Sequence, residues 1–96
     1  MKNAMIIDAK DNVAVALEPI AKGKPVTYAL EGRDVSLTAM QDITIYHKIA
    51  VRDILKGEAV VKYGEHIGLA ACDIQAGEHV HVHNVEERRE NLEDQA

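Results

Sequence analysis

The chain of 96 residues contains no Trp, no Phe and only three Tyr. A core without large rings must be filled by Ala, Val and Ile, which favours close-packed strands over a deep aromatic pocket. The sequence also lacks a Lys/Arg-rich stripe. Because bases stack on aromatic rings and phosphates pair with clustered cations, these two absences argue against a nucleic-acid partner.

A long apolar run and a second cysteine are also missing. No segment approaches the roughly 20 apolar residues that cross a bilayer, and Asp8, Lys10 and Asp11 interrupt the region where a signal peptide would be apolar. Cys72 cannot form an internal disulfide, and its apolar surroundings in the sequence predict a small core residue rather than a nucleophile. These features predict a cytoplasmic protein with no membrane partner.

The net charge of −5 is concentrated at the C-terminus. Residues 86–96 carry five acids and two arginines, so the rest of the chain is near charge balance. This segment has helix-favouring composition but one apolar residue, Leu92. We therefore expect a single domain over residues 1–85, followed by a short charged helix or tail over residues 86–96.

A seven-residue pattern recurs in which Ile is followed by Gly after three residues and by Val after three more. It occupies residues 20–26, 54–60 and 74–80, and a weaker copy at 43–49 has Tyr46 in place of glycine. Asp precedes the Ile in three of the four copies. Since Gly adopts backbone angles that other residues avoid and Asp accepts hydrogen bonds from turn amides, each copy predicts a chain reversal between short strands. The irregular spacing argues against a solenoid and favours a compact, mostly β fold of short strands and tight turns.

Apolar and alternating runs predict strands over residues 4–7, 13–17, 26–30, 35–39, 58–63 and 79–83. In the last of these, alternation places His79, His81 and His83 on one face, about 7 Å apart, with Val80 and Val82 facing the core. Such a row could bind a divalent metal or an anionic substrate, with further ligands from a second element or a second chain. The alternative is a solvent-facing strand whose polar face happens to be histidine.

Two lysines and a fourth histidine lie close to turns. His47 and Lys48 are in the weaker copy of the repeat, and Lys62 ends a predicted strand. Either lysine could pair with a carboxylate, although charge counting alone favours an ordinary solvated side chain for both. No phosphate-binding loop, dinucleotide fingerprint, H-E-x-x-H motif or cysteine pair occurs, and Ser36 is the only serine, so a self-contained catalytic triad is unsupported.

The stretch from His47 to Asn84 resembles the amino-terminal SAF domain of the altronate/galactarate dehydratase family. The most specific strings are K-Y-G-E-H-I-G at 62–68 and G-E-H-V-H-V-H-N at 77–84. The resemblance implies a β-clip fold, with the SAF domain over residues 1–85. It also implies a hydro-lyase that removes water from a sugar acid with a divalent metal, usually iron, held mainly by a large catalytic subunit or domain. The isolated chain would then be inactive.

The resemblance also suggests roles for individual side chains. Removing water from a hydroxy acid needs positive charge at the developing enediolate and a proton donor at the departing hydroxyl. The residues assigned on this basis are His81 and His83 for catalysis, His47, Lys48 and Lys62 for substrate binding, and His79, His81 and His83 for metal binding. Tyr46 departs from the family, which commonly has Gly there, and this leaves the geometry of His47 open.

Several alternatives remain open at this point. The chain could be a stand-alone SAF-type carbohydrate-binding or assembly module, an independent metal-binding protein, or the small subunit of a sulfolactate sulfo-lyase. It could be a separate subunit or an excised domain, and exposed strand edges leave self-association open. The sequence does not choose the sugar acid or the metal.

Overall fold

The computed structural model describes residues 2–86, and within this range the chain forms short strands and turns with no helix. The predicted mostly β fold is therefore confirmed, whereas the expected charged helix or tail lies almost wholly outside the described residues. No described element is a helix that could span a membrane. The strands are β1 (Ala4–Met5), β2 (Val13–Ala16), β3 (Pro25–Leu30), β4 (Arg33–Thr38), β5 (Lys48–Ala50), β6 (Ala59–Lys62), β7 (Glu65–Ala70), β8 (His79–Val80) and β9 (Val85–Glu86).

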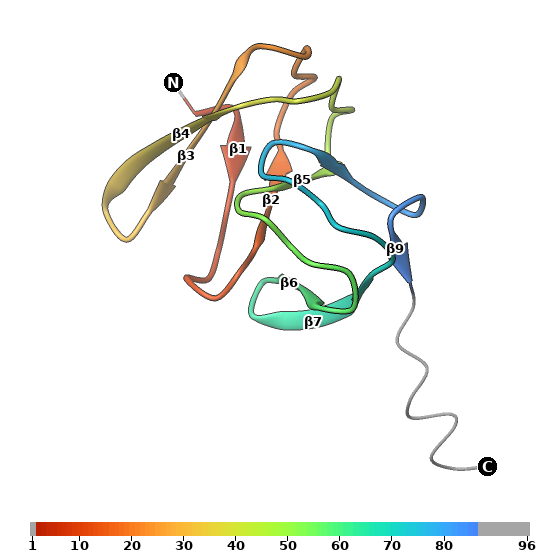
Figure 1. Cartoon of the computed structure of the whole chain (residues 1–96). Coiled ribbons are helices and arrows are strands. Elements are labelled where there is room, and N and C mark those ends of the chain that lie inside the picture. The colour runs from red at the N-terminus through yellow and green to blue at the C-terminus, as the bar shows by residue number, and fades with distance from the viewer. Residues whose placement is uncertain (1, 87–96) are drawn as a thin grey trace, which may run out of the picture.

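These strands form three antiparallel sheets (Figure 1). The central sheet has the order β1-β2-β5-β8, the β3–β4 hairpin lies to one side, and β6-β7-β9 forms the third sheet. Residues on the two faces of β2 enter different apolar clusters: Ala14 packs into the first and Val13 into the second. All four residues of β2 are buried, so the central sheet lies between two small cores.

The four copies of the repeat pair two by two. Ile20 and Ile43 exchange both backbone hydrogen bonds across one isolated bridge, and Ile54 and Ile74 do the same across another. All four isoleucines are buried in the cores. The predicted turns therefore occur in pairs, and backbone hydrogen bonds between the isoleucines hold each pair together.

The aspartates before the isoleucines accept hydrogen bonds from turn amides, as predicted, but the amide belongs to the paired copy. The carboxylate of Asp42 accepts from the N–H of Lys22 at 2.9 Å. The pairs Asp53–Ala76 and Asp73–Lys56 repeat this contact at 2.9 and 2.8 Å. Each aspartate thus ties two distant turns together. The fourth equivalent position is Pro19, which has no carboxylate to offer.

Tyr46 adopts the backbone conformation that glycine has in the other copies. The φ angles of Gly23, Gly57 and Gly77 are 88°, 89° and 93°, and that of Tyr46 is 69°. A left-handed conformation is costly for a residue with a Cβ. The residue is 70% exposed, so packing of its side chain offsets little of this strain. The departure from glycine at this position therefore leaves Tyr46 with a strained backbone.

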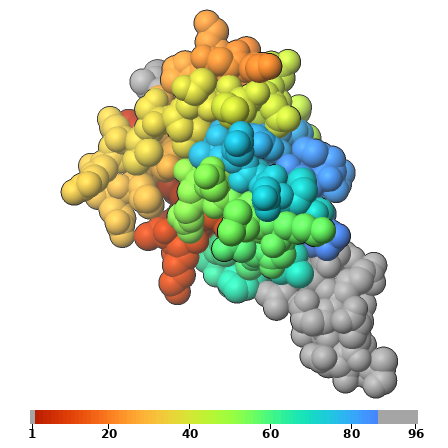
Figure 2. Space-filling view, in the orientation of Figure 1, coloured from red at the N-terminus to blue at the C-terminus, as the bar shows by residue number. Residues whose placement is uncertain are grey.

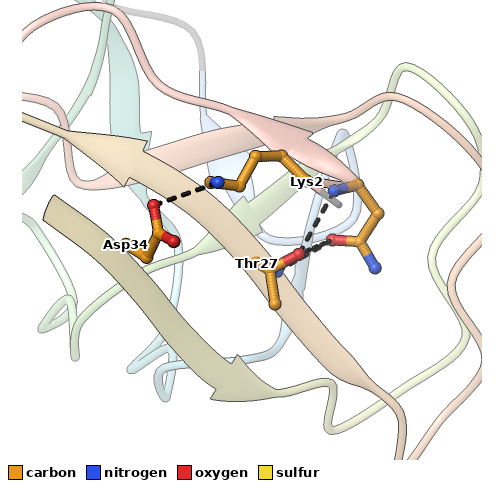
Figure 3. Close-up of polar contacts among 4 residues, drawn as sticks. Lys2, Thr27 and Asp34 are labelled. Atoms are coloured by element: carbon orange, nitrogen blue, oxygen red, sulfur yellow. Dashed lines mark hydrogen bonds and ion pairs between the residues drawn. The ribbon is translucent and has the colours of Figure 1, made fainter. Parts of the chain in front are cut away.

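The N-terminal segment is tied to the β3–β4 hairpin (Figure 3). The side chain of Asn3 accepts a hydrogen bond from the backbone N–H of Thr27 at 2.8 Å. The ammonium of Lys2 lies 3.0 Å from the carboxylate of Asp34. Because this ion pair is exposed, it adds little to stability, and the hydrogen bonds of Asn3 position the hairpin.

Two local expectations are wrong. The strand predicted over 79–83 ends at Val80, and residues 81–84 form a turn. Val82 consequently points outward, with 82% of its surface exposed, instead of facing the core. Cys72 is exposed rather than packed in the interior, because it follows the end of β7 at a bend.

Candidate functional site

Pairing of β5 with β8 brings two histidine-bearing segments together. Lys48 and Ile49 of β5 pair with Val80 and His79 of β8. His47 directly precedes β5, so its ring lies beside that of His79 although 32 residues separate them. Figure 2 shows the blue-coloured segment that includes β8 lying against the green segment near residue 50. The predicted second element is therefore the start of β5.

His47 and His79 are joined by a hydrogen bond between their rings. The distance from Nδ1 of His47 to Nε2 of His79 is 2.8 Å, and the ring planes differ by 17° with centroids 5.0 Å apart. These values describe nearly coplanar rings that meet edge to edge. One nitrogen must donate its hydrogen while the other offers a lone pair, so the two nitrogens cannot both be protonated.

The ring of His81 lies over the face of His47. Their centroids are 4.1 Å apart and the planes differ by 16°. One nitrogen from each of His47, His79 and His81 lies within 4.8 Å of the other two. We call these three residues the imidazole cluster. Each of them is half-buried.

His83 lies at the edge of the cluster. Its ring centroid is 5.2 Å from that of His79, with the planes tilted by 37°, and the residue is exposed. The structure therefore brings together two members of the predicted metal-binding row, and His47 takes the third place. Spacing along one strand could not find His47, because its contact depends on strand pairing.

The side chain of Asn84 stabilises the turn that places His81 in the cluster. Its side-chain oxygen accepts from the N–H of His81 at 2.9 Å, and its side-chain nitrogen donates to the carbonyl of His79 at 2.8 Å. Asn84 is 3% exposed. Gln41 provides a second support, because its side-chain oxygen accepts from the N–H of His79 at 2.9 Å. Sequence reasoning missed both residues, although an Asn ending the histidine row was a signal for a turn.

Two members of the cluster, His79 and His81, favour the neutral imidazole form. Burial, followed by the proximity of His47, His83, His81 and Lys48, lowers the pKa of His79 below its usual value. Burial, followed by His47, Lys48 and His83, lowers the pKa of His81 in the same way. The buried Nδ1 of His81 has no hydrogen-bond partner among the described residues. His79 and His81 thus offer unprotonated nitrogens to a ligand, and His81 Nδ1 has no hydrogen-bond partner in the part of the chain that the structure describes.

Lys48 and His81 share a surface hollow. Its volume is about 370 Å³, and it is lined by Lys48, Ile67, His81, Val82 and Val85. Burial and the nearby charge of Lys62 lower the pKa of Lys48. The ammonium of Lys62 lies 4.9 Å from the ring centroid of Tyr63, within cation–π range. The predicted substrate-binding residues His47, Lys48 and Lys62 therefore lie in one region.

A larger hollow of about 490 Å³ lies between the turns that contain Ile20 and Ile43. Its lining includes neither histidine nor lysine, so it has none of the groups that the predicted chemistry requires. The polar groups converge at the cluster instead. The fold and the site together define a small all-β domain that displays imidazoles and a half-buried amine at a surface hollow.

This chain belongs to the family described as the altronate/galactarate dehydratase SAF domain, which matches residues 2–88. The resemblance read from the histidine and glycine strings is thereby confirmed. The match covers all the residues of the imidazole cluster and of the hollow beside it.

Three relatives show how the domain is used elsewhere. Altronate dehydratase of Escherichia coli (strain K12) is 48% identical over 88 residues, which cover 92% of this chain and 16% of that protein. Altronate dehydratase of Bacillus subtilis (strain 168) is 43% identical over 94 residues, with coverage of 98% and 18%. The (2R)-sulfolactate sulfo-lyase subunit alpha of Chromohalobacter salexigens is 39% identical over 88 residues, with coverage of 88% and 94%. The chain thus spans less than a fifth of either dehydratase, and most of each dehydratase lies outside the matched region.

Proposed function

We propose that this chain is the SAF unit of a hydro-lyase that removes water from a sugar acid, and that a larger catalytic subunit or domain completes its active site. Two facts support the proposal: the chain is similar to a small part of two altronate dehydratases, and its own polar groups gather at an open surface hollow. A site of this kind needs a second surface to exclude water from the reaction.

The chemistry assigns distinct tasks to the residues. A sugar acid presents a carboxylate and several hydroxyls. Lys48 borders the hollow and pairs with the carboxylate, while Lys62 and His47 add donors nearby. His81 lies on the wall of the hollow, and its lowered pKa suits it to accept the proton beside the carboxylate. His83, exposed beside His79 at the edge of the imidazole cluster, is placed to hydrogen-bond the departing hydroxyl and supply its proton.

The resemblance also implies a divalent metal, iron in most members, which we place mainly in the larger catalytic region. Imidazole nitrogen is a ligand that iron accepts, so the donor set of the imidazole cluster fits such an ion. His47, His79 and His81 are the residues of this chain that would contact it. When bound, the metal would supply positive charge at the developing enediolate.

The observation that carries the proposal is the convergence of imidazoles from two distant segments beside Lys48. The test is co-purification of the chain with a larger dehydratase subunit, followed by a screen of sugar acids for keto-acid product. We expect product from the assembled enzyme and none from the chain alone. Keto-acid formation by the chain alone, or by the larger subunit with undiminished rate in its absence, contradicts the proposal.

A sulfo-lyase role is the second candidate. It is favoured by one observation: the match extends over 94% of the sulfolactate sulfo-lyase subunit alpha. The same cations would bind the carboxylate and sulfonate of sulfolactate, and sulfite would leave in place of water. Assaying the assembled enzyme with sulfolactate for released sulfite, beside altronate and galactarate for keto acid, distinguishes the two.

A further inference from the structure

We propose that His47, His79 and His81 form a binding site for one divalent transition-metal ion within this chain itself. The proposal rests on and deepens the metal assignment of the proposed function, because it gives this chain enough ligands to hold an ion without the larger region. Its basis is the three nitrogen atoms, one from each ring, that lie within 4.8 Å of one another.

The spacing of the His47 and His79 nitrogens is close to that of two ligands around a bound ion. With metal–nitrogen bonds of about 2.1 Å, two ligands lie about 3.0 to 3.4 Å apart for bond angles between square and tetrahedral. His47 Nδ1 and His79 Nε2 are 2.8 Å apart. The two nitrogens therefore need to move apart by only a few tenths of an ångström, provided that the rings also turn so that both lone pairs aim at one point beside the line that joins them.

At least one lone pair already points into the space between the rings. The ring-to-ring hydrogen bond requires an unprotonated acceptor nitrogen, and loss of the shared hydrogen exposes the second. His81 stacks on His47 with its Nδ1 buried and unpartnered in the described chain. Turning this ring about its Cβ–Cγ bond to face the ion therefore sacrifices no hydrogen bond at Nδ1.

Hydrogen bonds from neighbouring side chains hold the backbone of two of the proposed ligands in place. The segment that bears His79 and His81 is fixed by Asn84 and Gln41 through hydrogen bonds to its backbone. Such fixation keeps donor atoms in place before an ion arrives. The ligands also come from two elements, β8 with its following turn and the start of β5, so they can surround an ion from two sides.

The donor set selects the class of ion. Three imidazoles suit zinc, cobalt, nickel, copper or iron, whereas calcium and magnesium require oxygen ligands. Three protein ligands leave a fourth position open, as in catalytic rather than structural zinc sites. Here His81 borders the hollow that Lys48 also lines. An anionic ligand occupying the open position would meet the Lys48 amine.

The test is calorimetric titration of the purified full chain with Zn²⁺, with Co²⁺ absorption as a report on nitrogen coordination. We expect one ion per chain. His47→Ala, His79→Ala and His81→Ala should each weaken binding by at least about 100-fold, the upper end of what losing a supporting partner costs. His66→Ala, which removes the histidine on β7, is the matched control and should bind as the parent chain does. Absence of binding by the parent chain overturns the proposal.

Two further variants distinguish the proposed site from a metal site along residues 79–83 and test the role of His47 itself. His83→Ala should retain Zn²⁺, whereas loss of binding in His83→Ala with retention in His47→Ala would assign the site to the row along residues 79–83 and overturn the proposal. His47→Gln keeps side-chain bulk and hydrogen-bonding capacity, so a folded His47→Gln chain that binds Zn²⁺ normally also contradicts it. Because no partner subunit or sugar acid is present, failure here leaves the lyase proposal standing.

Discussion

The glycines of the repeat allow a graded test of how the turns pack. Gly57 and Gly77 occupy equivalent positions, with φ angles of 89° and 93°. A Cβ added at Gly57 meets no atom within 4 Å, whereas one at Gly77 overlaps the carbonyl oxygen of Thr38 and comes within 2.9 Å of Met40 Cγ. The two substitutions by alanine therefore impose the same backbone strain but differ in packing.

The strain alone sets the cost at Gly57. A left-handed alanine costs about 1–2 kcal/mol, and the stiffer unfolded chain returns about 0.4–1 kcal/mol, so Gly57→Ala should lose about 1 kcal/mol. Gly77→Ala must also move backbone. Gly77 donates to Ala50 and accepts from Met40 at 2.7 and 2.8 Å, and disturbing such contacts together with overpacking adds about 2–3 kcal/mol.

Thermal and urea denaturation of both variants, with a chelator present to remove metal effects, measures the difference. For a domain of this size each kcal/mol shifts the melting temperature by about 4–8 °C. Gly57→Ala should therefore lose only several degrees, and Gly77→Ala more than about 10 °C. Equal losses, or a larger loss for Gly57→Ala, would refute the packing of the 74–80 turn against the end of β4.

Three further predictions concern single residues. Tyr46→Gly should stabilise the chain by about 0.5 kcal/mol, because it relieves left-handed strain; a drop in the melting temperature contradicts this. Asn84→Ala should cost about 2–3 kcal/mol in urea unfolding, since it leaves buried backbone groups at His79 and His81 unpaired, and should weaken Zn²⁺ binding; unchanged values in both refute the role of Asn84. Burial raises the pKa of Tyr28 above 10.0, although Arg52 lowers it; its stabilising contribution is therefore present below about pH 10 and lost as pH rises through the folded-state pKa. In urea denaturation, the free energy of unfolding of Tyr28→Phe should therefore fall less than that of the parent chain as the pH rises above about 10. An equal fall in both chains argues against this prediction.

The repeat was readable in the sequence because its turns depend on local chemistry. Gly57 and its equivalents need positive φ, and aspartates such as Asp53 need nearby amides. The pairing of the copies was not readable, because Asp53 could accept from any exposed turn amide. Only the folded chain selects Ala76 as its partner.

The histidine row shows where alternation fails. Side chains alternate between two faces only while the strand continues. The side chain of Asn84 hydrogen-bonds the backbone of His79 and His81, in place of continued strand pairing. The strand therefore stops at Val80, Val82 points outward, and His81 returns to the cluster through the turn.

The contact of His47 with His79 could not be derived from the sequence, although the resemblance assigned His47 to substrate binding. Its neighbour is set by the register of β5 against β8, a long-range pairing that spacing along one segment does not encode. What the sequence did contain was the composition of the candidate site, since its histidines and lysines near turns and strand ends are residues that the structure brings into one region.

The measurement that bears most directly on the active-site role of the imidazole cluster is the turnover number of the assembled lyase carrying His81→Ala, with His66→Ala as the control. If the cluster belongs to the active site, His81→Ala lowers turnover by about 100-fold or more, the scale of a lost acid–base group, while His66→Ala retains the parent rate. Parent-like turnover by His81→Ala in a correctly assembled enzyme would contradict that role.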